Sequence, residues 1–221
     1  MIGYFVTGTD TDVGKTYVGC TLARRAVSRG HKVFAFKPVE TGCRRTADGL
    51  YRGEDQELLA AAAGDWQTGA LRGLYRFPLP AAPLVAAVHA ESSIDLDLVE
   101  RTARAGAAAG NATFTLVEGA GGWRVPITRT ADMATLALRL GLPVIIVARA
   151  GLGTINHSLL TIEAVERDGC HLAALVLSHR PTDDPAFTAS NRAQIERRWP
   201  GPLVILGNDP GALDSLIPDP Q

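Results

Sequence analysis

A glycine-bracketed polar segment near the start of the sequence carries the clearest chemistry. Gly8 to Thr16 reads Gly-Thr-Asp-Thr-Asp-Val-Gly-Lys-Thr, between the apolar residues Tyr4 to Val6 and a helical pattern from Tyr17 to Arg29. A strand, a glycine loop, Lys-Thr and a helix form the phosphate-binding loop arrangement, in which backbone N–H groups and a helix N-terminus surround phosphate oxygens. We expect Lys15 to contact the outer phosphates and the Thr16 hydroxyl to bind Mg²⁺.

The spacing of this loop departs from the general motif by one residue. The general pattern places four residues between its two glycines, whereas five separate Gly8 from Gly14, because Thr9 stands where the motif has glycine. The alternative is an ordinary strand-to-helix turn that happens to contain Gly-Lys-Thr. The agreement of the flanking strand and helix favours phosphate binding.

Three charged residues lie at other points where the chain is expected to turn. Glu118 follows an apolar run and precedes the glycine-rich stretch Gly119 to Gly122. A carboxylate there supplies the hard oxygen that Mg²⁺ prefers, and the alternative is a solvent-facing glutamate. Asp55 opens a helical segment, where the helix dipole alone favours an acid. Lys37 ends another apolar run, and taken alone it could equally be a solvent-exposed lysine.

Alternating apolar runs and helical patterns must position these residues. The predicted strands are 4–6, 33–36, 71–77, 113–117, 143–148, 172–177 and 203–206, and the predicted helices are 17–29, 54–63, 84–90, 95–108, 131–140, 154–167 and 184–198. This alternation predicts a single α/β domain over residues 1–221, P-loop NTPase-like, with a mostly parallel central sheet and helices on both faces. Ligands bind such sheets at the carboxyl ends of the strands. We expect a loop at 41–52 and a helix cap at Ser93.

Composition and charge argue against several classes of protein. The 22 basic and 23 acidic residues give a net charge of −1 without a basic tail, so no nucleic-acid partner is expected. The 3 cysteines are far apart, which is typical of a reduced, cytoplasmic protein. No signal peptide and no bilayer-spanning run is apparent, so no membrane partner is expected. His89 and His157 have no partner pattern, and we interpret them as structural or polar contacts.

Four stretches together resemble the dethiobiotin synthetase family, the ATP-dependent cyclising ligases of biotin synthesis. They are Tyr4–Thr16, Lys37–Gly42, Val117–Trp123 and Gly151–His157. The five-residue spacing of the phosphate loop, a departure from the general motif, is the spacing that this family has. The resemblance extends from the N-terminus to about Gly211.

This resemblance implies a reaction and a set of site residues. The family carboxylates 7,8-diaminopelargonate with CO₂ and closes a ureido ring with ATP, giving dethiobiotin, ADP and phosphate. By resemblance, Lys37 and Lys15 are catalytic, and Thr16, Asp55 and Glu118 hold Mg²⁺. The implied substrate site lies at a homodimer interface and uses Thr11, Thr41, Gly151, Leu152 and Asn156. The implied nucleotide-binding residues are Asp12, Val13, Gly14, Lys15, Thr16, Tyr17, Asp55, Glu118, Gly119, Ala120, Gly121, Ser178, His179, Asp209, Pro210 and Gly211.

Three other functions share parts of this pattern. Partition and septum-positioning ATPases usually carry a second lysine five residues before the loop lysine, where this chain has Asp10, and no basic amphipathic helix for a membrane follows at the C-terminus. Amidoligases of the cobyrinate type need a glutamine-hydrolysing domain, for which this chain is too short. A non-catalytic nucleotide-binding module would not need Lys15, Lys37 and Glu118.

The residues after the strand 172–177 depart from the family pattern. Some members have Asn-Asp there, and the Asn amide contacts the adenine edge, whereas this chain has Ser178-His179. A serine hydroxyl cannot offer a donor and an acceptor in one fixed plane as an amide does. The nucleotide would then be held chiefly through its phosphates, which all nucleoside triphosphates share.

We therefore expect CTP, GTP and UTP to support turnover to within about tenfold of ATP, a difference of ~1.4 kcal/mol. Ser178→Asn should restore some preference for ATP, because an amide can pair with the adenine edge. The measurement is kcat/KM for the four nucleotides with both proteins. A wild-type preference for ATP above about a hundredfold would indicate that the loop 207–211, not Ser178-His179, recognises the base.

Overall fold

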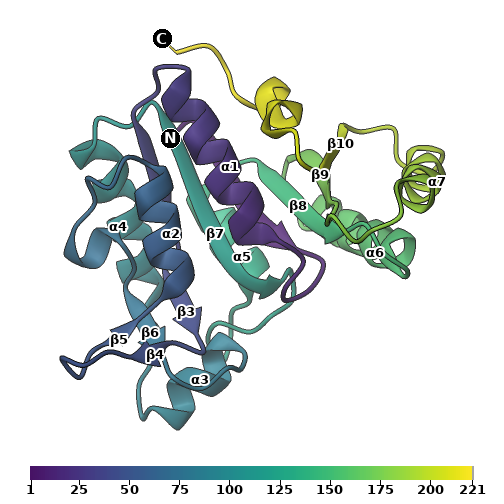
Figure 1. The fold of residues 1–221 in the computed structure, drawn as a ribbon. Coiled ribbons are helices and arrows are strands. Elements are labelled where there is room, and N and C mark those ends of the chain that lie inside the picture. Colours follow the sequence, from purple (N-terminus) through teal and green to yellow (C-terminus); the bar gives the residue numbers. More distant parts are fainter. Residues whose placement is uncertain (221) are drawn as a thin grey trace.

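The computed structural model describes residues 1–220, and its centre is a six-stranded sheet (Figure 1). The strand order is β10-β9-β8-β1-β7-β2, and every neighbouring pair is parallel. The strands are β1 (Gly3–Gly8), β2 (Val33–Phe36), β7 (Phe114–Gly122), β8 (Val144–Arg149), β9 (Leu172–Ser178) and β10 (Leu203–Leu206). The predicted α/β class with a mostly parallel sheet is confirmed.

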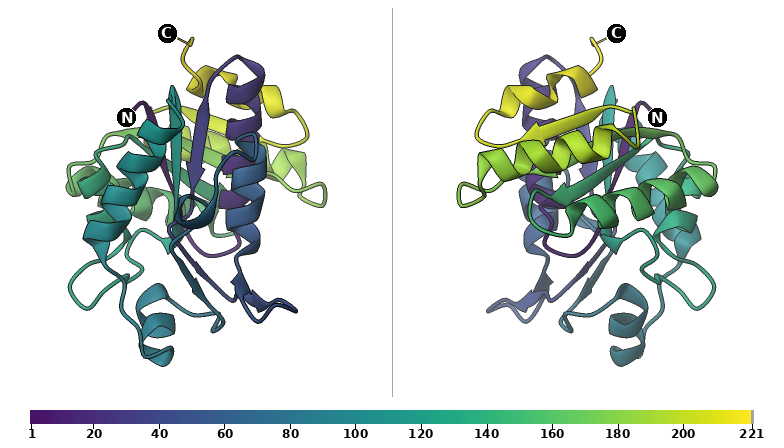
Figure 2. Two further views of the ribbon diagram at one scale, coloured as in Figure 1. Left: turned by 90° about the vertical axis from the view of Figure 1, so that its left-hand side faces the viewer. Right: turned by 90° about the vertical axis from the view of Figure 1, so that its right-hand side faces the viewer.

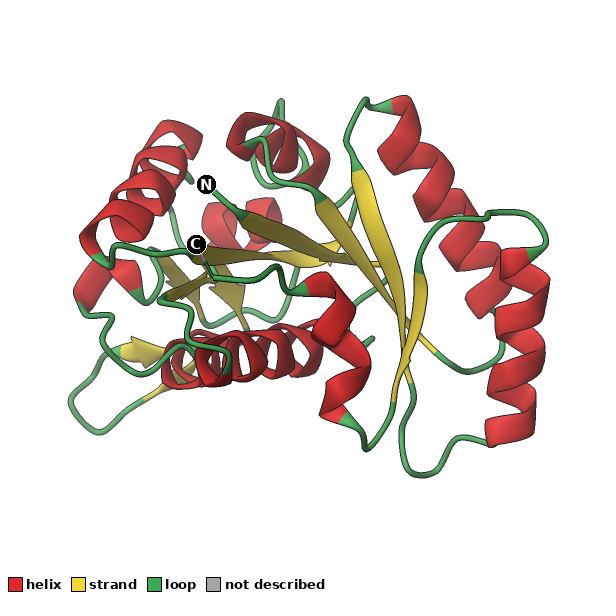
Figure 3. Ribbon diagram, turned by 90° about the horizontal axis from the view of Figure 1, so that it is seen from above, coloured by secondary structure: helices red, strands yellow, loops and turns green. Residues whose placement is uncertain are grey.

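Helices cover both faces of this sheet (Figures 2 and 3). They are α1 (Lys15–Ser28), α2 (Glu54–Ala62), α3 (Pro83–His89), α4 (Leu96–Ala109), α5 (Met133–Leu140), α6 (Thr154–Arg167) and α7 (Pro185–Glu196), with two 3₁₀ turns, η1 (Gly69–Leu71) and η2 (Pro210–Leu216). Helices α1 and α2 and turn η2 share one hydrophobic core, and α4 to α7 share the other. No helix within residues 1–220 is long and apolar enough to cross a membrane.

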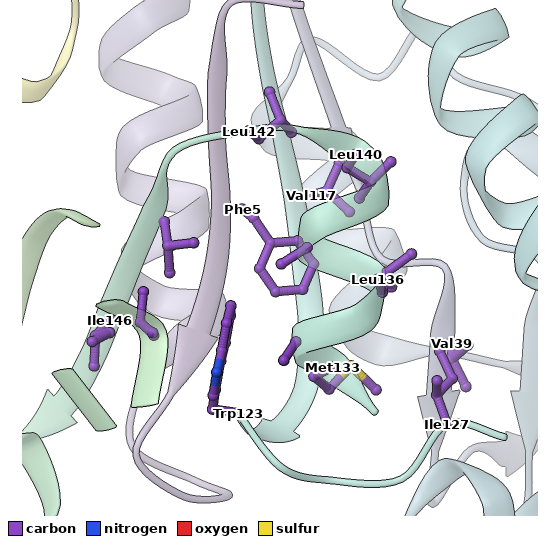
Figure 4. Packing of buried hydrophobic residues seen from close by; sticks show 14 of the residues in the cluster. Phe5, Val39, Val117, Trp123, Ile127, Met133, Leu136, Leu140, Leu142 and Ile146 are labelled. Carbon is purple, nitrogen blue, oxygen red and sulfur yellow. The ribbon is translucent and has the colours of Figure 1, made fainter. Parts of the chain in front are cut away.

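The two cores follow directly from the alternation of side chains along each strand. In β1, Phe5 packs into the core of α4 to α7 and Val6 into the core of α1 and α2; Ile146 and Ile145 of β8 divide in the same way. Figure 4 shows Phe5 beside Trp123 and α5. Because both faces are covered, the strands are continuous apolar runs, which is why they were recognisable in the sequence.

Short strands and helix α3 lie near the carboxyl ends of β1 and β7 (Figure 1). β3 (Val39–Thr41) pairs in parallel with β6 (Tyr75–Phe77), and β4 (Arg44–Arg45) pairs in antiparallel fashion with β5 (Tyr51–Arg52). The prediction of a strand over 71–77 was wrong for its first half, and 69–71 forms a 3₁₀ turn. The predicted loop 41–52 contains the small β4–β5 hairpin.

Two predicted boundaries also differ from the structure. β7 does not end at Val117 but continues through Glu118 to Gly122, so Glu118 lies inside a strand. After Glu118 the register with β1 shifts, and Gly122 lies opposite Gly8. Helix α4 is capped by Asp95, whose carboxylate accepts bonds from two backbone N–H groups, and not by Ser93. The two serines before Ile94 are too far from the first helical turn to cap it.

Candidate active site

The loop between β1 and α1 has the shape expected of a phosphate site. Asp12 and Gly14 adopt left-handed backbone conformations, with φ of 57° and 99°. α1 begins at Lys15 without a side-chain cap, so the N–H groups of its first turn are available to an anion. Lys15 Nζ donates to the Asp10 carbonyl at 2.9 Å. Burial lowers the pKa of Lys15, despite nearby carboxylates that raise it.

Strand register places two of the predicted residues side by side at the end of the sheet. Phe36 of β2 lies opposite Val117 of β7, so the next residues along the two strands are Lys37 and Glu118. Lys37 Nζ donates to Glu118 Oε1 at 2.9 Å and also to Asp55 at the start of α2. Both Lys37 and Glu118 are buried. A buried ammonium of this kind requires such partners.

The charge state of Lys37 follows from these contacts. Burial alone would lower the pKa of Lys37, but the charges and hydrogen bonds of Glu118 and Asp55 outweigh it, and the pKa lies above its ordinary value. Thr16 Oγ1 of α1 donates to the same oxygen, Glu118 Oε1, at 2.9 Å. Four separate elements, β2, α2, β7 and α1, therefore converge on one small cluster of polar atoms.

Three members of this cluster fit a magnesium ion. Thr16, Asp55 and Glu118 offer a hydroxyl and two carboxylates, the hard oxygen ligands that Mg²⁺ prefers. Glu118 Oε2 is buried and has no hydrogen-bond partner among the described residues, so it is an acceptor that a cation would satisfy. No group of three His, Cys, Asp or Glu side chains suited to a metal occurs within residues 1–220. A site of two carboxylates plus nucleotide phosphates is typical of Mg²⁺.

A cavity of about 630 Å³ opens above the phosphate loop and this cluster. Its size falls within the range of small-molecule sites. It brings together most of the predicted residues, namely Thr11, Asp12, Gly14, Lys15, Thr16, Tyr17, Lys37, Thr41, Asp55, Glu118, Ala120 and Gly121. Val13 and Gly119 do not line it; Val13 packs in the core, and Gly119 lies against Phe5. The sequence did not single out Glu40, Pro80–Pro83 or Val125, which also line the cavity.

A second set of predicted residues gathers beside the phosphate loop, at the ends of β9 and β10. Ser178 approaches the loop so closely that a Cβ at Gly14 would lie 2.5 Å from its hydroxyl. His179 Nδ1 is 2.9 Å from Thr188 Oγ1, which fixes the ring. Tyr17 of α1 donates to the Gly207 carbonyl at 3.0 Å. Asp209 caps η2 by accepting from the Gly211 N–H. None of Asp209, Pro210 and Gly211 lines the cavity.

The third set lies at the turn between β8 and α6. Gly151, Leu152 and Asn156 do not line the cavity of their own chain, and Leu152 is 82% exposed. His89 and His157 are exposed and also lie outside the cavity. The structure therefore does not bring the predicted residues of the turn 151–157 into the cavity that Lys15 and Lys37 line.

Comparison with known proteins agrees with this arrangement. Residues 3–208 match a family model described as an AAA domain. Over 215 residues the chain is 43% identical to an ATP-dependent dethiobiotin synthetase of Anaeromyxobacter dehalogenans strain 2CP-C, covering 95% of this chain and 92% of the relative. A synthetase of Anaeromyxobacter sp. strain K is 44% identical over 200 residues, covering 89% and 85%.

The chain belongs to the dethiobiotin synthetase family.

Solved structures show how widely the fold is shared. The cell-division protein complex MinC:MinD of Aquifex aeolicus superimposes with a TM-score of 0.57 at 13% identity, covering 98% of this chain and 85% of that one. The signal recognition particle receptor FtsY of Elizabethkingia anophelis gives 0.54 at 14% identity, covering 96% and 61%. At such identity the likeness concerns the fold alone. The fold is thus shared with proteins whose names indicate other functions.

The position of Glu118 leads to a test of the magnesium site. Glu118→Gln should weaken binding of the Mg²⁺–nucleotide complex by about tenfold or more, since even outer-shell partners of metals cost that much. Binding of metal-free nucleotide should change much less. Calorimetry with and without Mg²⁺ measures both affinities. Glu54→Gln removes an exposed charge beside Asp55 and serves as the control. Equal losses with and without Mg²⁺ would show that Glu118 is not a ligand.

Proposed function

We propose that the protein is an ATP- and Mg²⁺-dependent cyclising ligase that converts 7,8-diaminopelargonate and CO₂ to dethiobiotin. Two observations support this together: membership of the dethiobiotin synthetase family, and the presence of Lys15 and Lys37 on one cavity beside a phosphate loop. A nucleotide-binding module without catalysis would not need a second buried lysine opposite the loop.

The reaction brings two anions together, the carbamate and the γ-phosphate. This is why the site needs positively charged groups. One amine attacks CO₂ and loses a proton, giving a carbamate. A carbamate oxygen then attacks the γ-phosphorus and displaces ADP. The second amine attacks the carbonyl carbon and expels phosphate, which closes the ureido ring. Fixed positive charges in a cavity shielded from water favour the approach of carbamate to phosphate and stabilise the charge that spreads during transfer.

Four charged residues of the cavity, Lys15, Lys37, Asp55 and Glu118, have a part in this scheme. Lys15, at the start of α1, neutralises the γ-phosphate and the approaching carbamate. Thr16, Asp55 and Glu118 would hold Mg²⁺, which when bound neutralises phosphate charge. Lys37 then shares its two carboxylates with another cation, and its ammonium becomes available to the carbamate. Thr11 and Thr41 both line the cavity and in this scheme contact the diamine or carbamate.

We further propose a homodimer in the cytoplasm, with the substrate carboxylate on the turn 151–157 of the second subunit. The first turn of α6 offers unpaired N–H groups after Gly153, which suit an anion. Leu152 on the same turn is exposed, so its side chain is accessible to a second subunit. The loops after β9 and β10 would border the base.

The activity itself is tested with purified protein, diaminopelargonate, bicarbonate, Mg²⁺ and ATP. Dethiobiotin and ADP should form in equal amounts, and mass spectrometry detects the ring-closed product. Omission of each component in turn is the control. ADP formation that does not depend on diaminopelargonate would contradict the proposal and indicate a simple ATPase.

Lys37→Gln should lower kcat by about 10²–10³-fold, the usual cost of removing one contact that stabilises transition-state charge. Lys32→Gln is the matched control, since Lys32 lies just before the same strand β2 but is exposed. Circular dichroism and thermal unfolding establish that both variants are folded. Near-normal turnover of Lys37→Gln would remove Lys37 from the catalytic machinery.

The shared site predicts that activity depends on subunit association. Specific activity should fall on dilution in step with the dimer fraction measured by light scattering, because each cavity lacks its carboxylate site in a monomer. The nucleotide is kept at a saturating concentration, so that its occupancy does not change as the protein is diluted. A fully active monomer at assay concentration would contradict the shared site.

A further inference from the structure

Two buried polar residues beside the cavity have no part in the scheme above. Glu40 lies in β3 and is 7% exposed, and Gln56 lies in the first turn of α2 and is fully buried. Buried polar groups are costly unless they are hydrogen-bonded, so their contacts indicate what they are for. Both residues join the chain segment that follows β2 to the start of α2.

Glu40 caps helix α2 from a different element. Its Oε1 accepts from the Asp55 N–H at 3.0 Å, and its Oε2 accepts from the Gln56 N–H at 2.9 Å. The helix's own N-cap residue, Gly53, has no side chain for this purpose. A carboxylate at a helix N-terminus is also favoured by the helix dipole. Glu40 therefore fixes the backbone of Asp55 relative to β3.

Gln56 links α2 to the chain segment after β2 through side-chain hydrogen bonds. Its Nε2 donates to the carbonyl of Lys37 at 2.9 Å and to the carbonyl of Tyr75 at 3.3 Å. Lys37 lies where the chain leaves the central sheet, and Pro38 follows it, so no strand neighbour holds that carbonyl. Gln56 therefore fixes the backbone of Lys37 relative to α2.

Two glycines provide the space for these side chains. A Cβ atom at Gly53 would overlap the Glu40 carboxylate, and a Cβ atom at Gly73 would overlap the Gln56 amide. Neither glycine has a positive φ, so the requirement is one of space and not of backbone conformation. The local structure is thus built around the two polar side chains.

We propose that Glu40 and Gln56 are positioning residues that hold Lys37 and Asp55 in place relative to each other, an inference that rests on the function proposed above. In this structure Lys37 and Asp55 are also joined by their own ion pair. That pair must loosen when Asp55 binds a metal and Lys37 turns to the carbamate. The bonds of Glu40 and Gln56 involve only backbone atoms of these two residues, so they persist through that exchange.

A comparison of two buried glutamines, Gln56 and Gln67, distinguishes a positioning role in catalysis from a role in stability alone. Gln67 is fully buried like Gln56, and its Nε2 donates to the carbonyls of Ala35 at 2.8 Å and Leu71 at 2.6 Å, so it also holds the backbone of β2. Gln56→Met and Gln67→Met conserve volume and remove these bonds. Both should lower the unfolding temperature. Gln56→Met alone should lower kcat, by about 10–100-fold, the loss expected from a small misplacement of catalytic groups.

Variants of Glu40 test whether its capping of α2 positions Asp55, and the measured quantity is the affinity for a metal–nucleotide complex. Glu40→Ala removes both acceptors, whereas Glu40→Gln retains one carbonyl oxygen. Affinity for Mn²⁺–ADP, measured by the electron paramagnetic resonance of Mn²⁺, should fall in the order wild type, Glu40→Gln, Glu40→Ala, with ADP alone affected less. Asp95→Ala removes the side-chain cap of α4, a helix that does not line the cavity, and should change stability without changing Mn²⁺–ADP affinity.

The outcomes distinguish this proposal from the proposed function. If folded Gln56→Met matches Gln67→Met in kcat, or if the Glu40 variants match Asp95→Ala in Mn²⁺–ADP affinity, the positioning role is overturned. If Gln56→Met does not fold, the Glu40 series decides. If the wild-type protein forms no dethiobiotin, the proposed function fails, while the Mn²⁺–ADP affinities still establish or overturn the role of Glu40 in placing Asp55.

Discussion

The arrangement of the site depends on the burial of one positive charge, the ammonium group of Lys37. An ammonium group that leaves water loses far more hydration energy than a single contact returns, so Lys37 is tolerable only where carboxylates meet it with good geometry. Glu118 and Asp55 supply that geometry. They come from β7 and α2, and the Thr16 hydroxyl that shares Glu118 comes from α1. The arrangement requires β7, the end of β2 and the first turns of α1 and α2 to meet at one point. This requirement restricts the order of the strands in the sheet and the position of both helices.

The order of the central strands meets this requirement. β7 lies between β1 and β2, although it follows both of them in the sequence by many residues. Consequently three parts of the site lie side by side at the carboxyl ends of the strands. They are the phosphate loop after β1, Glu118 of β7 and Lys37 after β2. In parallel α/β sheets, ligand sites form where strand order reverses direction in this way.

Much of this site could be predicted from the sequence because its residues stand at the ends of apolar runs. The phosphate loop, Lys37 and Glu118 each follow such a run, and Asp55 opens a helical pattern. The continuation of β7 through its glycines was missed because glycine favours turns, and the segment includes a positive φ at Gly121 and a register shift against β1 that no local pattern indicates. Glu40 was missed because its role depends on a helix that begins fourteen residues later, which no local pattern can indicate. The 3₁₀ turn before β6 similarly depends on contacts beyond its own residues.

The glycines that accommodate Glu40 and Gln56 have a consequence for how such a sequence can change over generations. A larger residue at Gly73 would have to displace the buried Gln56 amide, and a larger residue at Gly53 would have to displace the buried Glu40 carboxylate. Residues in direct contact have strongly non-additive effects, so each position limits which neighbours can vary. The effect of a substitution at one of these four positions is therefore expected to depend on the residue at its partner, with Gly73 coupled to Gln56 and Gly53 coupled to Glu40.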